Sequence, residues 1–378
     1  MAYVPRKIET PIKEVSPYYQ VIVLTGPRQT GKTTTARHLF PDFEYHNLED
    51  PLERNIVESD PRNFIMKGAS SMIIDEVQRF PDLFSYIQVC VDNNPERKFV
   101  ITGSSDFALM EKITQSLAGR AALFTILPFS FKEVKEYVDR SSTDKLLYDG
   151  FYPGVLVKGK KPSVFYPNYY STYVERDARQ ITSIENLDLF RLFMRILAGR
   201  VSSEFNANSL SGEIGVSAPT IRKWLGILKT SYIVFTLTPY QTNLEKRLTK
   251  TPKVYFYDTG LLCNLLGILD LEQLKTHPLR GAVFENLAVI EMIKEKYNRA
   301  ASYDLYFYRE NGSREIDMLK VEGLDLSLYE VKSSGTFNKS FTKNLTYLKG
   351  LLGDRIKDTK VVYDGPTIPP LAINIRDL

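Results

Sequence analysis

The chain has 378 residues, of which 43% are hydrophobic and 25% are charged, and its formal net charge is +4. These values are typical of an ordinary folded protein of about two or three domains, and they exclude a strongly charged disordered chain. Its two cysteines and three histidines show no metal-ligand spacing, which argues against a structural zinc site and fits a reducing compartment. The first residues lack the apolar core of a signal peptide, and no apolar run could span a bilayer. We therefore expect a cytoplasmic protein without a membrane partner.

A complete phosphate-binding loop pattern, Gly-Pro-Arg-Gln-Thr-Gly-Lys-Thr, occupies residues 26–33. The β-branched run at 21–25 suits a buried strand, and residues 34–40 suit a helix whose N-terminus faces an anion. In this pattern Lys32 would reach the β- and γ-phosphates, and the Thr33 hydroxyl would bind Mg²⁺. The sequence therefore predicts ATP and magnesium as cofactors. The predicted nucleotide-binding residues are Gly26, Pro27, Arg28, Gln29, Thr30, Gly31, Lys32, Thr33 and Thr34.

A second apolar run, residues 71–76, ends in two acids, Asp75 and Glu76. In an open α/β sheet, ligands bind at the carboxyl ends of the strands, so Asp75 would face the phosphates. Asp75 would then hold Mg²⁺ together with Thr33, and Glu76 would orient or deprotonate the attacking water. The alternative is that the two acids cap a following helix.

A third strand, predicted over 98–105, ends in small polar residues. If it lies between the other two strands, it would aim Thr102 or Ser104 at the γ-phosphate or the water. The alternative is an ordinary Gly/Ser turn.

Arg120 precedes a fourth apolar run at 121–126. An arginine there would stabilise transition-state charge, either in its own subunit or in a neighbour's. The second case implies a ring-shaped homo-oligomer, whereas a solvated turn residue leaves a monomer or dimer open. Arg28, inside the loop, is a weaker candidate for the same role.

These motifs occur in a familiar order: GPRQTGKTT at 26–34, IIDEVQ at 73–78, ITGSS at 101–105 and LAGR at 117–120. They resemble those of a large group of bacterial and archaeal AAA-type ATPases, whose C-terminal region looks like a restriction-endonuclease fold. The resemblance implies an ATPase sheet with an additional strand and a catalytic glutamate over residues 1–140. It also implies that Asp75 and Glu76 are the metal and water pair and that Ser104 or Ser105 is the polar sensor.

A helix-turn-helix pattern follows at 208–228, after a helical linker or lid predicted for 141–190. Its first helix would end at Gly215, and Ser217 would cap the second helix. Apolar residues of the second helix share one face, whereas polar and basic residues project the other way. The sequence predicts a winged helix over 191–255. The residues predicted to face a partner are Thr220, Arg222 and Lys223.

The winged-helix segment is locally basic, because eight Lys or Arg stand against three Glu between Arg200 and Lys253, a net charge of +5. Such a footprint is expected of a surface that contacts double-stranded DNA. The alternative is a module that binds a partner protein and whose basic face is only solvated.

The remaining residues, 256–378, carry a constellation of acids and one lysine. A helix over 281–293 holds Glu285, and later strands hold Asp317 and then Glu330 with Lys332, which point to the same side because side chains alternate along a strand. Asp317 and Glu330 would share a divalent cation, while Lys332 would lower the pKa of a water or stabilise the charged intermediate.

This order resembles the PD-(D/E)xK group of restriction-type nucleases, although Ile316 stands where that motif has proline. The alternative is a retained fold that has lost the reaction and serves structure or binding.

The expected fold class is therefore α/β. It comprises a parallel-sheet P-loop core of AAA type, an all-α winged-helix module, and a small restriction-endonuclease-like domain. Two functions compete: an ATP-hydrolysing machine that handles DNA, and an ATP-gated switch that binds a protein through an inert C-terminal domain. A nucleotide kinase is disfavoured by the length, the Asp-Glu pair and the downstream modules.

Overall fold

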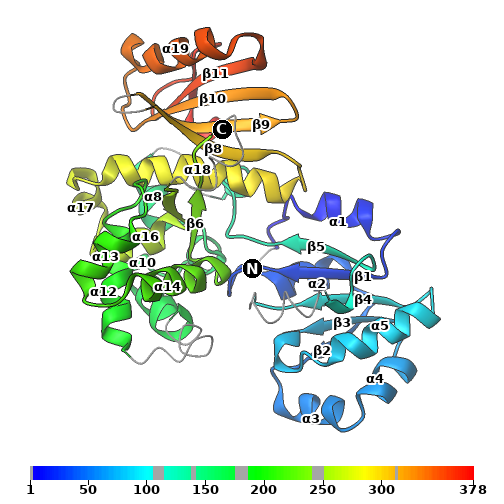
Figure 1. The fold of residues 1–378 in the computed structure, drawn as a ribbon. Helices are drawn as coiled ribbons and strands as arrows, with labels where there is room; N and C mark the ends of the chain where they lie inside the picture. The colour runs from blue at the N-terminus through cyan, green and yellow to red at the C-terminus, as the bar shows by residue number, and fades with distance from the viewer. Residues whose placement is uncertain (1–2, 105–114, 138–141, 175–185, 241–250, 311–313) are drawn as a thin grey trace.

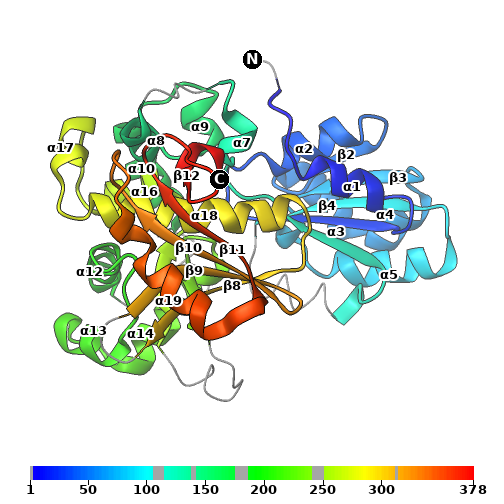
Figure 2. The same cartoon turned by 90° about the horizontal axis from the view of Figure 1, so that it is seen from above.

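The structure is a computed structural model that describes residues 3–104, 115–137, 142–174, 186–240, 251–310 and 314–378. Figure 1 shows a sheet near the N-terminus, a group of helices, and a second sheet that contains the C-terminus. The long helix α18 lies between the helical group and the second sheet (Figure 1), and Figure 2 shows it crossing the centre of the molecule from above. Among the helices within these ranges, none is long and apolar enough to cross a membrane.

The N-terminal sheet is fully parallel, with the strand order β2-β3-β4-β1-β5. The strands are β1 (Val21–Thr25), β2 (Glu44–Asn47), β3 (Ser71–Asp75), β4 (Lys98–Thr102) and β5 (Ala121–Thr125). The third strand of the sequence analysis, β4, lies between β1 and β3. The predicted parallel α/β core is therefore confirmed, including its additional strand.

Helices cover both faces of this sheet because successive strand residues point to opposite sides. Ile22 and Leu24 face a core that includes α1 and α2, whereas Val21 and Val23 face a core that includes α3, α4 and α5. These helices are α1 (Glu9–Val15), α2 (Lys32–Leu39), α3 (Pro51–Ser59), α4 (Pro61–Lys67) and α5 (Leu83–Asn93).

The middle part is helical apart from one antiparallel hairpin, β6–β7. Its helices α13 and α14 meet at Gly215, which has a φ of +80°, and Ser217 caps α14 as predicted. Trp224 of α14 packs against Phe190 and Phe193, which fixes the helices around one aromatic core. The elements are α7 (Phe131–Val134), α8 (Thr143–Asp149), α9 (Pro153–Leu156), α10 (Pro162–Tyr169), α12 (Leu187–Ala198), α13 (Ala207–Ile214), α14 (Ala218–Thr230), β6 (Val234–Leu237), β7 (Lys253–Phe256), α16 (Thr259–Leu265) and α17 (Leu271–Thr276).

The C-terminal sheet is mixed and has the order β12-β11-β10-β9-β8. Strands β8, β9 and β10 pair antiparallel, whereas β10, β11 and β12 pair parallel. The predicted helix and three acid-bearing or adjoining strands are present in the predicted order. The elements are α18 (Arg280–Asn298), β8 (Asp304–Glu310), β9 (Arg314–Glu322), β10 (Asp325–Lys332), α19 (Lys343–Leu352), β11 (Ile356–Tyr363) and β12 (Ala372–Asn374).

Helix α18 is tied to both neighbouring parts by buried polar side chains. Asn286 pairs with the backbone of β7, accepting from Phe256 N at 2.6 Å and donating to Phe256 O at 2.9 Å. One turn further on, Glu291 accepts from the backbone N of Phe131 at 2.7 Å, and Lys294 donates to the Phe129 carbonyl at 2.8 Å. These bonds connect α18 to the hairpin and to the chain that leaves β5.

Candidate functional site

The predicted phosphate loop joins the end of β1 to the start of α2. Gly26 has a φ of +132°, and a side chain there would collide with the backbone of Ile126. Gly31, with a φ of +95°, immediately precedes α2. Both positions therefore require glycine, the first for close approach and the second for a left-handed turn. The turn directs the first backbone N–H groups of α2 towards the loop, an arrangement suited to an anion.

The side chains of Lys32 and Thr33 lie on the inner side of this loop. The Lys32 ammonium donates to the carbonyls of Gly26 at 3.1 Å and Pro27 at 2.8 Å. The Thr33 hydroxyl lies 3.0 and 2.9 Å from the two carboxylate oxygens of Asp75. The loop and the end of β3 therefore meet, as the sequence predicted.

Asp75 is buried and accepts from three hydroxyl groups. Besides Thr33, they belong to Tyr45 of β2, at 2.7 Å, and to Thr102 of β4. Burial and the hydrogen bond to Asp75 raise the pKa of Tyr45 above its usual range, so Tyr45 remains a donor. A hydroxyl and a carboxylate held together are hard oxygen ligands, so Thr33 and Asp75 fit a magnesium ion. Nothing in the sequence around Tyr45 singled it out.

Glu76 follows Asp75 in an unusual backbone conformation, with a φ of +57°. Its side chain accepts from the amide of Gln78, which also donates to the Ser104 hydroxyl at 3.0 Å. Backbone strain of this kind clusters at functional sites and persists only where the surroundings hold it. Glu76 and Ser104 are thus brought together through Gln78, a residue that we did not predict. Ser105, the other candidate sensor, lies outside the described residues.

Arg120 is not brought to this site within one subunit. Strands β1 and β5 run parallel with Val21 beside Ala121, so Arg120 lies at the sheet edge opposite the phosphate loop. Roughly 15 Å of strand separates the two edges. Its guanidinium pairs instead with Asp92 of α5, at 2.9 Å for one contact. The prediction of a role in its own subunit is therefore wrong, because a residue before a parallel strand lies at the wrong end of it.

Arg6 binds a backbone carbonyl of the phosphate loop, and the sequence analysis did not predict this contact. Its guanidinium is buried and donates to the Thr30 carbonyl at 2.9 Å, the Leu127 carbonyl at 2.7 Å and the Glu133 carboxylate at 2.9 Å. Burial alone would raise the pKa of Glu133, but Arg6 and backbone donors of Ser130 and Lys7 hold it below its usual range. Glu133 is therefore charged, and the pair is a buried ion pair.

A cavity of about 250 Å³ adjoins the loop on the side of the N-terminal segment. Tyr3 and Val4 line it together with Thr34 and Thr35 of α2, and Pro153 and Val157 close it from α9 and the residue after it. The N-terminal sheet part and the helical part therefore share this cavity. Of the other predicted loop residues, Gln29 and Thr34 are exposed, and Arg28 is half-buried.

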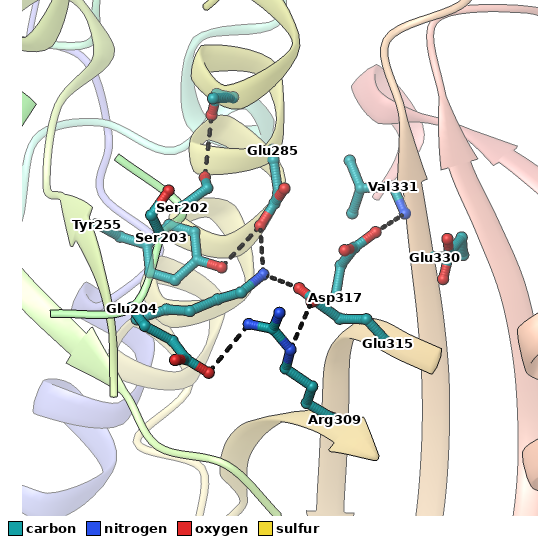
Figure 3. Close-up of polar contacts among 12 residues, drawn as sticks. Ser202, Ser203, Glu204, Tyr255, Glu285, Arg309, Glu315, Asp317, Glu330 and Val331 are labelled. Carbon is teal, nitrogen blue, oxygen red and sulfur yellow. Dashed lines mark hydrogen bonds and ion pairs between the residues drawn. The ribbon is translucent and has the colours of Figure 1, made fainter. Parts of the chain in front are cut away.

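The C-terminal part gathers four carboxylates, which we call the C-terminal acid cluster: Glu285, Glu315, Asp317 and Glu330. Figure 3 shows Glu285 and Tyr255 on one side of the cluster, and Asp317, Glu330 and Val331 on the other. The Val331 N–H donates to Asp317 at 2.7 Å, and the Tyr255 hydroxyl donates to Glu285 at 2.8 Å. The structure thus brings together Glu285, Asp317 and Glu330, which the sequence analysis placed on separate elements, and adds Glu315, which it did not predict.

Lysines, however, neutralise these acids. Lys332 donates to Glu330 at 2.6 Å and lies 3.9 Å from Asp317. Lys253 of β7 lies 3.4 Å from Glu285 and pairs with Glu315. Among the residues that the structure describes, no group of three acidic, His or Cys side chains is arranged to hold a metal ion. The cluster, as it stands, does not fit the divalent cation that the sequence predicted for Asp317 and Glu330.

Burial and neighbouring charges shift the pKa values of the groups in the cluster. Burial, followed by the charge of Asp317, raises the pKa of Glu285 to about 7 and that of Glu330 to about 7. Burial also raises the pKa of Asp317. For Lys253, burial favours the neutral form, but Glu285 and Glu315 outweigh it and raise its pKa. Lys253 is therefore charged and buried.

The basic surface of the middle part is smaller than its sequence suggested. Lys253 is only 4% exposed, and the charge of Arg200 is offset by its exposed ion pair with Glu213. Arg222 and Lys223 are exposed on α14, whereas Thr220 is half-buried with its hydroxyl 2.8 Å from that of Ser217. The remaining basic residues of the predicted wing, Lys246, Arg247 and Lys250, lie outside the described residues.

Three family models match consecutive parts of the chain. An AAA domain matches residues 18–135, and two domains of unknown function, DUF8612 and DUF4143, match residues 140–272 and 280–377. The Walker-type ATPase PABY2304 of Pyrococcus abyssi is a similar solved structure, with a TM-score of 0.44 and 16% identity over 68% of this chain and 94% of that one.

Full-length relatives are similar over most of the chain. The uncharacterized protein MJ1544 of Methanocaldococcus jannaschii is 22% identical over 79% of this chain and 72% of its own length. The uncharacterized protein Rv2008c of Mycobacterium tuberculosis is 31% identical over 93% of this chain and 78% of its own length. The N-terminal part is thus a P-loop ATPase domain of AAA type, and the chain belongs to the protein family that includes Rv2008c.

Proposed function

We propose that the chain binds ATP with magnesium on residues 26–34 and hydrolyses it. The observation that carries this proposal is the meeting of Thr33 and Asp75, within 3.0 Å, at the edge where the phosphate loop lies. Both are oxygen ligands of the kind that magnesium takes when it also contacts phosphates. Bound magnesium would neutralise charge on the β- and γ-phosphates.

The other residues of the site would act on the phosphates and the water. Lys32 would turn from the loop carbonyls to the phosphates, since its ammonium lies within the loop that would hold them. Glu76 would orient the attacking water or accept its proton. Gln78 would hold the Glu76 carboxylate and link it to Ser104, whose hydroxyl would be the polar group that contacts the γ-phosphate.

The cavity beside the loop is our proposed site for the nucleoside. It is lined by apolar groups of Val4, Pro153 and Val157, with Tyr3 available for contact with a base. Small-molecule sites are usually concave, mostly apolar and located between domains. A nucleoside there would contact the ATPase core and α9 together, which would let the helical part sense the nucleotide.

Lys32→Ala is expected to weaken ATP binding by about tenfold to a hundredfold, because one charge-assisted contact to phosphate contributes about 1.5–3 kcal/mol. Isothermal titration calorimetry with a slowly hydrolysed ATP analogue measures this loss, and a phosphate-release assay measures turnover. Lys67→Ala, which changes an exposed lysine of α4, is the matched control. Unchanged binding and turnover in Lys32→Ala would exclude the phosphate loop as the site.

A second proposal concerns residues 191–255, which we propose form a winged helix that contacts double-stranded DNA. Helices α13 and α14 followed by the hairpin β6–β7 support this proposal, as does the pair of exposed cations on α14, Arg222 and Lys223. A helix carrying cations on its outer face can lie in a groove between phosphates. A partner protein is the alternative occupant of the same face.

Binding to a DNA duplex is expected to weaken steeply as salt rises, because counterions are released from neutralised phosphates. In the double variant Arg222→Ala/Lys223→Ala, the negative slope of log affinity against log salt should become shallower by about 2. Lys349→Ala, on α19, is the control with an exposed lysine in the other sheet domain. Fluorescence anisotropy over a salt series measures the slope, and an absence of binding even at low salt would favour the partner protein.

For residues 256–378 we propose a restriction-endonuclease-like fold that does not cleave in the described form. The order α18, β8, β9, β10, α19, β11 and the joint placement of Glu285, Asp317, Glu330 and Lys332 support the fold. The lysines that occupy the acid cluster favour the alternative in which that fold serves structure or binding.

A further inference from the structure

Lys253 reaches the C-terminal acid cluster from outside the C-terminal sheet. It lies on β7, whose residues pair with β6, and its own backbone forms an isolated bridge with Glu204. From there its side chain passes the ring of Phe307, 5.4 Å from the ring centre, and ends between Glu285 and Glu315. The ammonium is therefore placed by the middle part among acids of α18 and β9.

Carboxylates from two different elements surround the Lys253 ammonium. Glu285 and Glu315 come from two elements and both contact it, and the Tyr255 hydroxyl supports Glu285 at 2.8 Å. A lysine offers three donors and no acceptor, so carboxylates are its natural partners when it is buried. Lys253 therefore supplies one positive charge between Glu285 and Glu315.

The cluster has more carboxyl groups than cations. Its four carboxylates face three cations, which are Lys253, Lys332 and Arg309, and Arg309 is shared with Glu204 at 3.0 Å. One oxygen of Glu330, a residue only 6% exposed, is buried without a hydrogen-bond partner. The unpaired Glu330 oxygen leaves one ligand position of the cluster unused.

We propose that the Lys253 ammonium takes the place of a divalent cation in the C-terminal acid cluster. A metal binds carboxylate oxygens at about 2.0–2.6 Å. A metal bound to Glu285 would therefore lie close to the Lys253 ammonium that contacts the same carboxylate, and the two positive charges would repel each other. Only one of the two cations can occupy this position. Lys253 thereby makes the cluster a neutralised junction between β7, α18 and β9 instead of a metal centre. Loss of this one charge converts the junction into a divalent-cation site.

The test is a titration of the full chain with Mn²⁺ in the absence of nucleotide. Electron paramagnetic resonance measures the concentration of free Mn²⁺ at each step. Lys253→Gln is expected to bind Mn²⁺ at least about tenfold more tightly than the wild type, because carboxylates alone suit hard cations. Lys253→Arg keeps the charge and is expected to match the wild type. In Lys253→Gln/Glu285→Gln the gain should disappear, which locates the gained site at Glu285. The proposal is overturned if the wild type and Lys253→Gln bind Mn²⁺ equally tightly, or if neither binds it.

A second measurement needs no variant and decides the question even if Lys253→Gln does not fold. In the wild type, Lys253 is expected to resist acylation by an amine-reactive ester, read by peptide mass spectrometry, and to remain protected in saturating Mn²⁺. Lys158, which is exposed, is the internal positive control. A Mn²⁺-dependent rise in acylation of Lys253 would show that a metal displaces it, and would refute the proposal. Neither measurement involves ATP, so a failure of the proposed ATPase activity leaves both results unaffected.

Discussion

Glu76→Gln is expected to lower ATP turnover by about a thousandfold while leaving nucleotide affinity within about threefold. The carboxylate would act on the attacking water only in the transition state, so its loss affects kcat more than binding. The glutamine keeps the size of the side chain and a hydrogen bond to Gln78, which preserves the contacts around Ser104. Single-turnover phosphate release, with binding measured separately by calorimetry, distinguishes the two effects.

The control for this variant is Glu58→Gln, the same substitution at an exposed position on α3. Its turnover should match the wild type. If Glu76→Gln retained more than about a tenth of wild-type turnover, the acid that follows Asp75 would not be the group that acts on the water, given the usual size of general-base effects.

The second large effect is expected on stability. Arg6→Ala removes one partner of a buried ion pair, which typically costs about 3–5 kcal/mol of unfolding free energy because the other charge stays buried. Glu133 would keep the backbone donors of Ser130 and Lys7, at 2.7 and 2.9 Å, so we expect the lower end of that range. Denaturant unfolding measures the loss. Because Arg6 also holds the Thr30 carbonyl, ATP affinity should fall as well.

The pH dependence of this loss follows from the lowered pKa of Glu133, whose ordinary value is 4.5. A lowered pKa in the folded state stabilises the fold above the ordinary value, and this contribution disappears as pH falls through the lowered value. The gap between wild type and Arg6→Ala should therefore be complete at neutral pH and shrink in acid. Arg62→Ala, at an exposed site on α4, should show no such gap. A gap that does not change with pH would mean that Arg6 acts by packing alone.

The ATPase part could be predicted because its chemistry is encoded in local patterns. The loop pattern fixes Lys32 and Thr33 within a few residues, and an apolar strand that ends in an acid places Asp75 at the same sheet edge. The contacts of Tyr45 and Arg6 with the site were not predicted, because each residue reaches the site only through the tertiary fold. Arg120 lies away from the loop because it precedes β5, whereas the loop follows the end of the parallel strand β1.

The charge count of the middle part failed for a related reason. A sum over sequence treats every Lys as solvated, whereas Lys253 is 4% exposed and faces acids that follow it by more than thirty positions. Likewise, Glu285, Asp317 and Glu330 were predicted from the order of the helix and strands, but Glu315 was not, and Lys253 comes from another element. Nothing in a local pattern reports such a pairing.

Helix α18 connects the segment beside the phosphate loop to the hairpin β6–β7. Its 19 residues span about 28 Å. Asn286, in its first half, is bonded to β7, while Glu291 and Lys294, in its second half, are bonded to Phe131 and Phe129 at the start of α7 and just before it. The same segment carries Leu127 and Glu133, the partners of Arg6. Because one rigid helix is bonded to both, the position of the hairpin β6–β7 is coupled to that of the chain beside the phosphate loop.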